Sequence, residues 1–190
     1  CRRTRSGTVC ARLSHKRPLM SSSDRANEQN PYFPAIEDIK AAAQRINPVA
    51  VRTPCTVHDV LSVKYGAHVY FKREDLQPVR SYKLRGAFNK MADFDQAQRK
   101  NGFVCASAGN HAQGFALACK YLKTHGTIFM PVTTPSQKIA QVRMFGQEFV
   151  EIRLVGDTFD DANNAAYDFS RENGANFIHP FEDKKVIEGQ

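Results

Sequence analysis

The sequence predicts an α/β fold in which helices cover both faces of a parallel sheet. Strand-like and helix-like patterns of apolar residues alternate four times from residue 68 onward, with connections of a few residues. The composition is that of a globular protein, with 42% apolar residues and 11 glycines in 190 residues. It excludes collagen, low-complexity and wholly disordered chains. Right-handed crossovers between parallel strands then place helices on both faces.

Three elements precede the alternating region. Isoleucine and alanine at helical spacing predict a helix over 35–46. The stretch 49–55 is predicted to be extended, because Pro54 prevents a helix there. A short helix over 57–66 ends at Gly66, where a left-handed conformation costs little.

The strands and helices of the alternating region follow in order. Short apolar runs predict strands at 68–75, 102–108, 127–132, 148–155 and 176–181. Helical spacing predicts the intervening helices at 81–94, 110–123, 135–146 and 158–174. Pro135 begins the third of these helices. Thr158 and Asp161 form a capping box for the last, which Gly174 ends. In such sheets ligands bind beyond the carboxyl ends of strands, so we look for chemistry at the strand-to-helix junctions.

Positive charge is concentrated at the N-terminus. The chain has 27 Lys and Arg against 19 Asp and Glu, a net charge of +8, and six of the basic residues lie in 1–19 without any acidic residue. We predict that 1–34 is a basic and polar segment, disordered or non-native. Non-native or upstream-translated sequence, an organellar transit segment and a nucleic-acid-binding arm are all open for 1–19. The arm is least favoured, since no aromatic residue is present to stack on bases, and we expect no nucleic-acid partner.

Cysteine and histidine usage indicates neither a disulfide framework nor a metal site. The five cysteines form no C-x-x-C pair, which favours a reducing, cytoplasmic compartment. Cys105 and Cys119 lie in apolar segments and are predicted to be buried. The histidines lack metal-ligand spacing, so no metal is expected. Surface or structural roles are predicted for His58, His68, His125 and His179. No apolar stretch approaches the roughly 18 residues that span a bilayer, so no membrane partner is expected.

The junction after the strand at 102–108 reads SAGNHAQG (107–114). Its small residues permit a tight turn, and the amide N–H groups of Asn110 and His111 lie at a helix N-terminus. Such amides and the helix dipole attract carboxylate or phosphate. The segment is neither a Walker loop nor a G-x-G-x-x-G fingerprint. An anion site and a simple tight turn both remain open at this point.

The junction after the strand at 68–75 leads to Lys83, near the start of a predicted helix. An isolated lysine is ordinarily a solvated surface residue. Here, like charges and a helix N-terminus favour the uncharged amine, which a Schiff-base lysine requires. These flanking cations are Lys72, Arg73, Arg80 and Arg85. Glu74 and Asp75 are predicted to be their salt-bridge partners.

Two motifs in this order carry a resemblance to a known family. The segments KREDLQPVRSYKLRGAFNKM (72–91) and ASAGNHAQGFALA (106–118) resemble the threonine dehydratases, or threonine ammonia-lyases. These are pyridoxal-phosphate (PLP) enzymes of the tryptophan synthase β-like fold, also called fold type II. Further matching segments are 128–146, 156–162 and 179–190. The resemblance covers about residues 35–190.

The resemblance implies roles for five residues. The lysine of S-[YF]-K carries the cofactor and corresponds to the catalytic Lys83. The asparagine of S-x-G-N-H contacts the pyridoxal 3′-oxygen and corresponds to Asn110. The substrate carboxylate is held by the loop residues Ser107, Gly109, Asn110 and His111. Cysteine synthases carry threonine where this chain has His111, which argues against that branch.

The resemblance also implies that the sequence is the front part of a longer catalytic domain. In the family, V-I-x-G-Q lies near the middle of the domain, whereas here it is at 186–190. The loop that binds the cofactor phosphate would follow, and a small domain would span about 81–175. The chain is thus expected to be truncated.

The implied activity is the PLP-dependent conversion of L-threonine to 2-oxobutanoate and ammonia, the first step towards isoleucine. A serine/threonine dehydratase, a serine racemase-like enzyme and an inactive fragment or interaction module are alternatives. A full-length protein is expected to be a cytoplasmic homo-oligomer, with organellar import if 1–19 is a transit segment.

Overall fold

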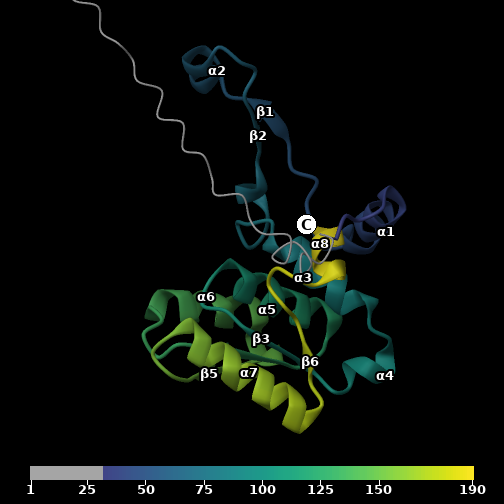
Figure 1. Cartoon of the computed structure of the whole chain (residues 1–190), viewed down its shortest axis with the longest axis vertical. Coiled ribbons are helices and arrows are strands. Elements are labelled where there is room, and N and C mark those ends of the chain that lie inside the picture. Colours follow the sequence, from purple (N-terminus) through teal and green to yellow (C-terminus); the bar gives the residue numbers. More distant parts are fainter. Residues whose placement is uncertain (1–31) are drawn as a thin grey trace, which may run out of the picture. The chain divides into compact units, whose positions relative to one another are not determined.

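In the computed structural model, which describes residues 32–190, four parallel strands form a sheet in the order β5-β4-β3-β6 (Figure 1). They are β3 (Phe103–Ala106), β4 (Gly126–Met130), β5 (Val150–Leu154) and β6 (Asn176–Phe177). Every residue of β3 and β4 is buried, as a parallel sheet covered on both faces requires. The predicted α/β class with a parallel sheet is confirmed.

Alternate side chains of β3 enter two separate hydrophobic clusters. Phe103 and Cys105 pack with residues of α5 (Asn110–Leu122) and α6 (Ser136–Gly146), while Val104 and Ala106 pack with α7 (Phe159–Asn173). Figure 1 shows α5 and α7 on opposite sides of the sheet. The predicted covering of both faces is therefore confirmed.

Local capping signals agree with the sequence. Helix α2 (Asp59–Tyr65) ends at Gly66, whose φ is 59°. Thr158 and Asp161 form the predicted capping box of α7, and Gly174 ends that helix with a φ of 66°. Each of these devices acts within one turn, which is why the sequence alone could predict it.

The predicted strand at 68–75 is wrong in its length and in its place. Strand β2 (Tyr70–Lys72) does not join the parallel sheet but pairs antiparallel with β1 (Cys55–Val57), with Thr56 opposite Phe71. All six residues of β1 and β2 are exposed. A strand with exposed side chains on both faces cannot be a central member of a parallel sheet, which is buried on both. The alternation that enters the parallel sheet thus begins at β3.

Within residues 32–190, two short helices were not predicted from the sequence. They are α4 (Gln96–Arg99) and α8 (Lys184–Gly189), both too short for a clear periodicity. Short 3-10 turns occupy Glu74–Leu76 (η2) and Gln147–Phe149 (η3), so the predicted strand at 148–155 begins later, at Val150.

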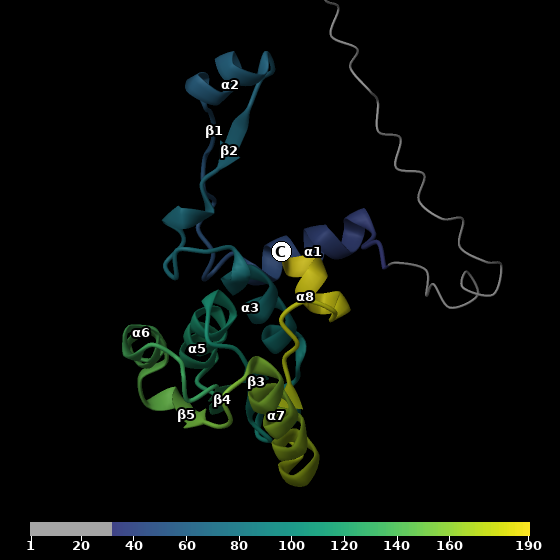
Figure 2. The ribbon, with the colours of Figure 1, turned by 60° about the vertical axis from the view of Figure 1, so that its left-hand side comes forward.

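The helix α8 packs beside α3 (Lys83–Asp93) and the predicted first helix, α1 (Ile36–Ile46), as Figure 2 also shows. Buried Asn89 joins these three helices, because it accepts from Arg45 Nη1 (2.5 Å) and donates to the carbonyl of Lys185 (2.7 Å).

Residues 34–190 form one compact unit. The small domain at about 81–175 within it stays a prediction, and the predictions for 1–31 lie outside the described residues. In residues 32–190, no helix has the length and apolarity needed to cross a membrane.

Candidate active site

The SAGNHAQG segment connects β3 to α5, as predicted. The Oγ of buried Ser107 accepts a hydrogen bond from the N–H of Gly109 (3.2 Å). Gly109 is the N-cap residue of α5 and provides no side-chain cap, and the first turn of the helix carries no acidic residue. The exposed Asn110 is the first helical residue. The amides of this turn are therefore oriented as an anion site requires, with the positive end of a 13-residue helix behind them.

Lys83 is the first residue of α3, and its side chain is half-buried. Its Nζ donates a hydrogen bond to the carbonyl of Pro180 (2.9 Å). The same atom lies 4.4 Å from the ring centroid of Phe181 and 5.2 Å from that of Tyr82. The amine is thus held at a defined point by a carbonyl and two aromatic rings.

Gly114 brings the two motifs together. A Cβ on this residue would lie 2.9 Å from Leu84 N and 3.0 Å from the carbonyl carbon of Lys83. Helix α5 therefore touches the main chain of the first turn of α3, which only a residue without a side chain allows. Gly114 lies in the SAGNHAQG segment, but the sequence predicted no role for it.

His111, the second residue of α5, is buried and only 4% exposed. Burial lowers the pKa of His111 to about 4, and the nearby charge of Lys83 acts in the same direction. The ring is therefore neutral near pH 7. Its Nε2 donates to the carbonyl of Ile178 (3.1 Å), which leaves Nδ1 as a buried acceptor without a protein partner. An acceptor cannot bind a carboxylate, so any contribution of His111 to the predicted anion site comes from its main-chain N–H.

The chain leaving β6 supplies the acceptors for both motifs. The carbonyls of Ile178 and Pro180 receive the bonds just described, and His179 Nδ1 accepts from the N–H groups of Phe181 (3.1 Å) and Glu182 (2.8 Å). None of these residues was predicted as a site residue. Residues 179–190 (HPFEDKKVIEGQ) carry part of the resemblance, so the sequence did contain a signal for this segment.

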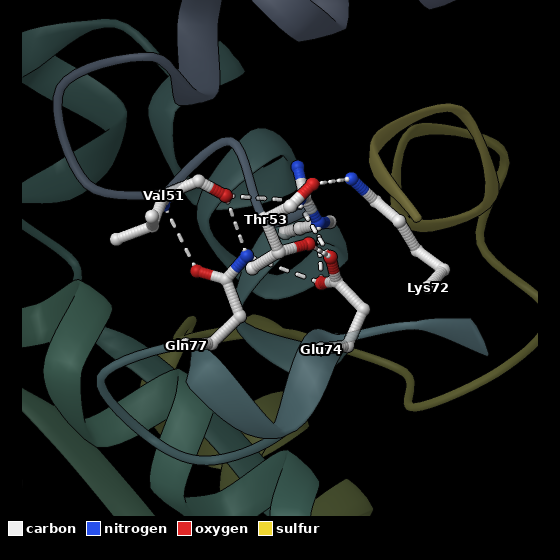
Figure 3. A network of polar contacts seen from close by, with 6 residues as sticks. Val51, Thr53, Lys72, Glu74 and Gln77 are labelled. Atoms are coloured by element: carbon white, nitrogen blue, oxygen red, sulfur yellow. Dashed lines mark hydrogen bonds and ion pairs between the residues drawn. The ribbon is translucent and has the colours of Figure 1, made fainter. Parts of the chain in front are cut away.

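A polar network fixes the approach to α3 (Figure 3). Buried Gln77 clamps the main chain of Val51, accepting from its N–H (2.9 Å) and donating to its carbonyl (2.8 Å). Glu74 accepts from Thr53 Oγ1 (2.5 Å), Gln77 Nε2 (3.2 Å) and Arg85 Nε (2.7 Å) and Nη2 (2.8 Å). Burial opposes ionisation of Glu74, but these hydrogen bonds outweigh it and lower its pKa. Arg85 lies in the first turn of α3, so the network holds the turn that carries the candidate lysine.

The predicted role of the acidic pair Glu74 and Asp75 is confirmed. The ion pair of Figure 3 has an exposed counterpart between Arg73 and Asp75 (2.7 Å). Lys72 also has a partner, because its Nζ donates to the carbonyl of Thr53. Two of the four cations expected to act on Lys83, Arg73 and Arg85, are thus paired with carboxylates.

The cysteines and histidines that were predicted to be buried, surface or structural residues lie as expected. Cys105 and Cys119 are buried as predicted, and burial raises the pKa of both thiols. His58 and His179 accept main-chain hydrogen bonds, and the other two predicted surface or structural histidines, His68 and His125, are exposed. Among the described residues 32–190, no group of three or more His, Cys, Asp or Glu side chains is placed to hold a metal ion.

Comparison with curated proteins finds close relatives. L-threonine dehydratase biosynthetic IlvA of Bacillus subtilis is 51% identical over 155 residues, which are 82% of this chain and 37% of the relative. The protein of the same name from Mycobacterium leprae is 46% identical over 171 residues, 90% of this chain and 40% of the relative. The chain therefore spans well under half the length of these relatives.

Solved structures agree with this relationship. The processed form of threonine deaminase isoform 2 from Solanum lycopersicum matches with a TM-score of 0.73 at 39% identity, over 84% of this chain and 44% of that one. Maize serine racemase matches with a TM-score of 0.77 at 31% identity, over 83% and 47%. Residues 46–190 match the family described as pyridoxal-phosphate dependent enzyme. This chain belongs to the family of pyridoxal-phosphate dependent enzymes.

Proposed function

We propose that the protein containing this chain is a PLP-dependent ammonia-lyase that converts L-threonine to 2-oxobutanoate and ammonia. The observation that carries the proposal is the position of the Lys83 amine. It donates to the Pro180 carbonyl, and Lys83 begins helix α3, whose first turn packs against α5 at Gly114. Relatives about half identical to this chain are named biosynthetic threonine dehydratases. We accordingly propose that the reaction serves isoleucine biosynthesis.

The residues present fit the reactive end of the cofactor and the substrate. Lys83 provides the amine for attachment, and Asn110 is proposed to contact the 3′-oxygen. The buried Ser81 Oγ and His111 Nδ1 have no protein partner. Ser81 lies two residues before Lys83, and the charge of Lys83 acts on His111, so both atoms can offer a hydrogen bond to a ligand near Lys83. When bound, PLP supplies an electron sink for the carbanion formed at Cα.

The chain's own residues then orient the substrate and move the proton. The N-terminus of α5, with Ser107, Gly109, Asn110 and the main-chain N–H of His111, is proposed to hold the carboxylate. When it is not bonded to the cofactor, the Lys83 amine would be the base that accepts the Cα proton. The Pro180 carbonyl keeps this amine in place. The β-hydroxyl leaves as water, and hydrolysis of the enamine product gives the oxo acid and ammonia.

A second candidate is a serine racemase-like or mixed serine/threonine enzyme, which the likeness to maize serine racemase favours. An inactive fragment or interaction module is a candidate of another class, because the chain spans only 37% of its curated relatives. Cytoplasmic location and homo-oligomeric assembly of the complete protein remain proposals from the resemblance.

Borohydride reduction of the complete gene product loaded with PLP tests the proposal. We expect the cofactor to be fixed on the peptide containing Lys83, with 2-oxobutanoate as the product from L-threonine. Lys83→Ala should abolish both, whereas Lys138→Ala, at an exposed lysine of α6, should change neither. D-serine as the main product from L-serine would favour the racemase. Labelling of another lysine would overturn the assignment.

A further inference from the structure

Phe181 presents an exposed aromatic ring beside the candidate reactive amine. Its ring centroid is 4.4 Å from Lys83 Nζ, yet the side chain is 62% exposed. The residues just before it behave differently, because Ile178 and Pro180 are buried and contribute carbonyls to the two motifs. A large apolar group exposed at this point is available to a ligand.

The main chain around Phe181 is fixed by a neighbouring side chain. His179 Nδ1 accepts from the N–H groups of both Phe181 and Glu182. The rings of His179 and Phe181 also meet edge to face, with centroids 6.2 Å apart and planes at 71°. These contacts with His179 hold the main chain and the ring of Phe181 near the Lys83 amine.

We propose that Phe181 is a specificity-determining residue that contacts the β-methyl group of L-threonine and so favours threonine over serine. This inference rests on the proposed function. A substrate whose nitrogen takes the place of Lys83 Nζ has its Cβ two bonds away, within reach of a ring 4.4 Å from that atom. While Lys83 is charged, its ammonium lies over the ring in a cation–π contact. Once the Lys83 nitrogen no longer lies over the ring, that face of Phe181 is free to contact an alkyl group.

Tyr82 is the other ring beside the amine and is the natural competitor for this role. It lies farther from Nζ, at 5.2 Å, and is less exposed, at 44%. It is also the N-cap residue of α3, so its main chain is committed to the helix start. The larger distance and the lower exposure of Tyr82 favour Phe181 as the contact for the methyl group.

Two amino acids that cannot lose a β-hydroxyl isolate the methyl contact. L-2-aminobutyrate and L-alanine differ by one methyl group, and their dissociation constants are measured by spectral titration of the PLP-loaded complete gene product. We expect the wild type to bind L-2-aminobutyrate more tightly. Phe181→Ala should reduce that preference about fivefold, since a methyl in a closed apolar pocket changes specificity by about 10- to 200-fold and this ring covers one side only. Phe181→Leu should retain most of it.

Kinetics provide the second readout. The ratio of kcat/KM for L-threonine to that for L-serine should fall about fivefold in Phe181→Ala and remain unchanged in Tyr121→Ala. Tyr121 is a comparably exposed aromatic residue, at 52%, near the opposite end of α5. Unchanged ratios in Phe181→Ala, or a loss found in Tyr82→Leu instead, would overturn the inference. Absence of turnover with either amino acid in the wild type would contradict the proposed function itself.

Discussion

Lys83 and His111 donate hydrogen bonds to carbonyls two residues apart on one segment, Nζ to Pro180 at 2.9 Å and Nε2 to Ile178 at 3.1 Å. They belong to α3 and α5, which also meet at Gly114. The exit of β6 thus fixes the distance between the candidate reactive amine and the candidate anion site. A displacement of this segment should disturb both at once.

The neutral state of His111 predicts a pH dependence of stability. The pKa is about 4 in the folded chain against 6.5 ordinarily, because burial disfavours the charged ring. The unfolded chain therefore binds a proton between these values that the folded chain resists, so stability falls as pH falls through this window. Between pH 7.5 and 4.5 we expect the wild type to lose about 2–3 kcal/mol more than His111→Gln.

Urea unfolding of the complete gene product at the two pH values measures this difference. Glutamine keeps a donor near the position of Nε2 but has no proton to gain. Equal losses in both proteins would mean that His111 is not buried as a neutral ring.

The outcome of the sequence predictions depended on how local each signal was. The capping box at Thr158 and the end of α7 at Gly174 act within a turn, and the sequence predicted both. The pairing of β2 with β1 was missed, since apolar spacing does not specify which strand is the partner. The bond from Lys83 to Pro180 joins residues 97 positions apart, and no local pattern encodes it. The sequence could therefore identify the motif residues, but not the segment that holds them together.

Replacement of Gly114 tests the contact between α5 and α3. A Cβ at this position would lie 2.9 Å from Leu84 N, so Gly114→Ala must push the first turn of α3 away. We expect a loss of about 1–3 kcal/mol of unfolding free energy, as for overpacking elsewhere. We also expect weaker PLP incorporation at Lys83, measured by borohydride labelling. Wild-type stability and labelling in this variant would show that the helices do not touch here.

The two acidic residues of the KRED segment offer a matched pair of variants. Glu74 and Asp75 both pair with arginine at 2.7 Å, but their side chains are 17% and 56% exposed. Glu74→Gln leaves the partly buried Arg85 without its counter-charge and should cost about 2 kcal/mol. Asp75→Asn should cost much less, since exposed pairs contribute little.

Denaturant unfolding at pH 7 compares these variants with the wild type. Hydrogen bonds lower the pKa of Glu74 despite its burial, so its contribution should be present at neutral pH and be lost as pH falls below about 4. Equal costs for the two variants would contradict the network of Figure 3.

The proposed anion site at the start of α5 predicts opposite effects on stability and on substrate binding. Asn110 is exposed in the first turn, which contains no acidic residue. Asn110→Asp changes little in shape but adds a negative charge beside the helix N-terminus. The helix dipole should then stabilise the fold by up to about 0.5 kcal/mol.

The same charge should repel the substrate carboxylate and raise the KM for L-threonine more than tenfold. Asn110→Ser separates loss of the proposed 3′-oxygen contact from added charge, because serine lacks the amide group but stays neutral. If both variants raise KM equally, the carboxylate does not bind at this helix terminus, whatever Asn110 contributes to the cofactor.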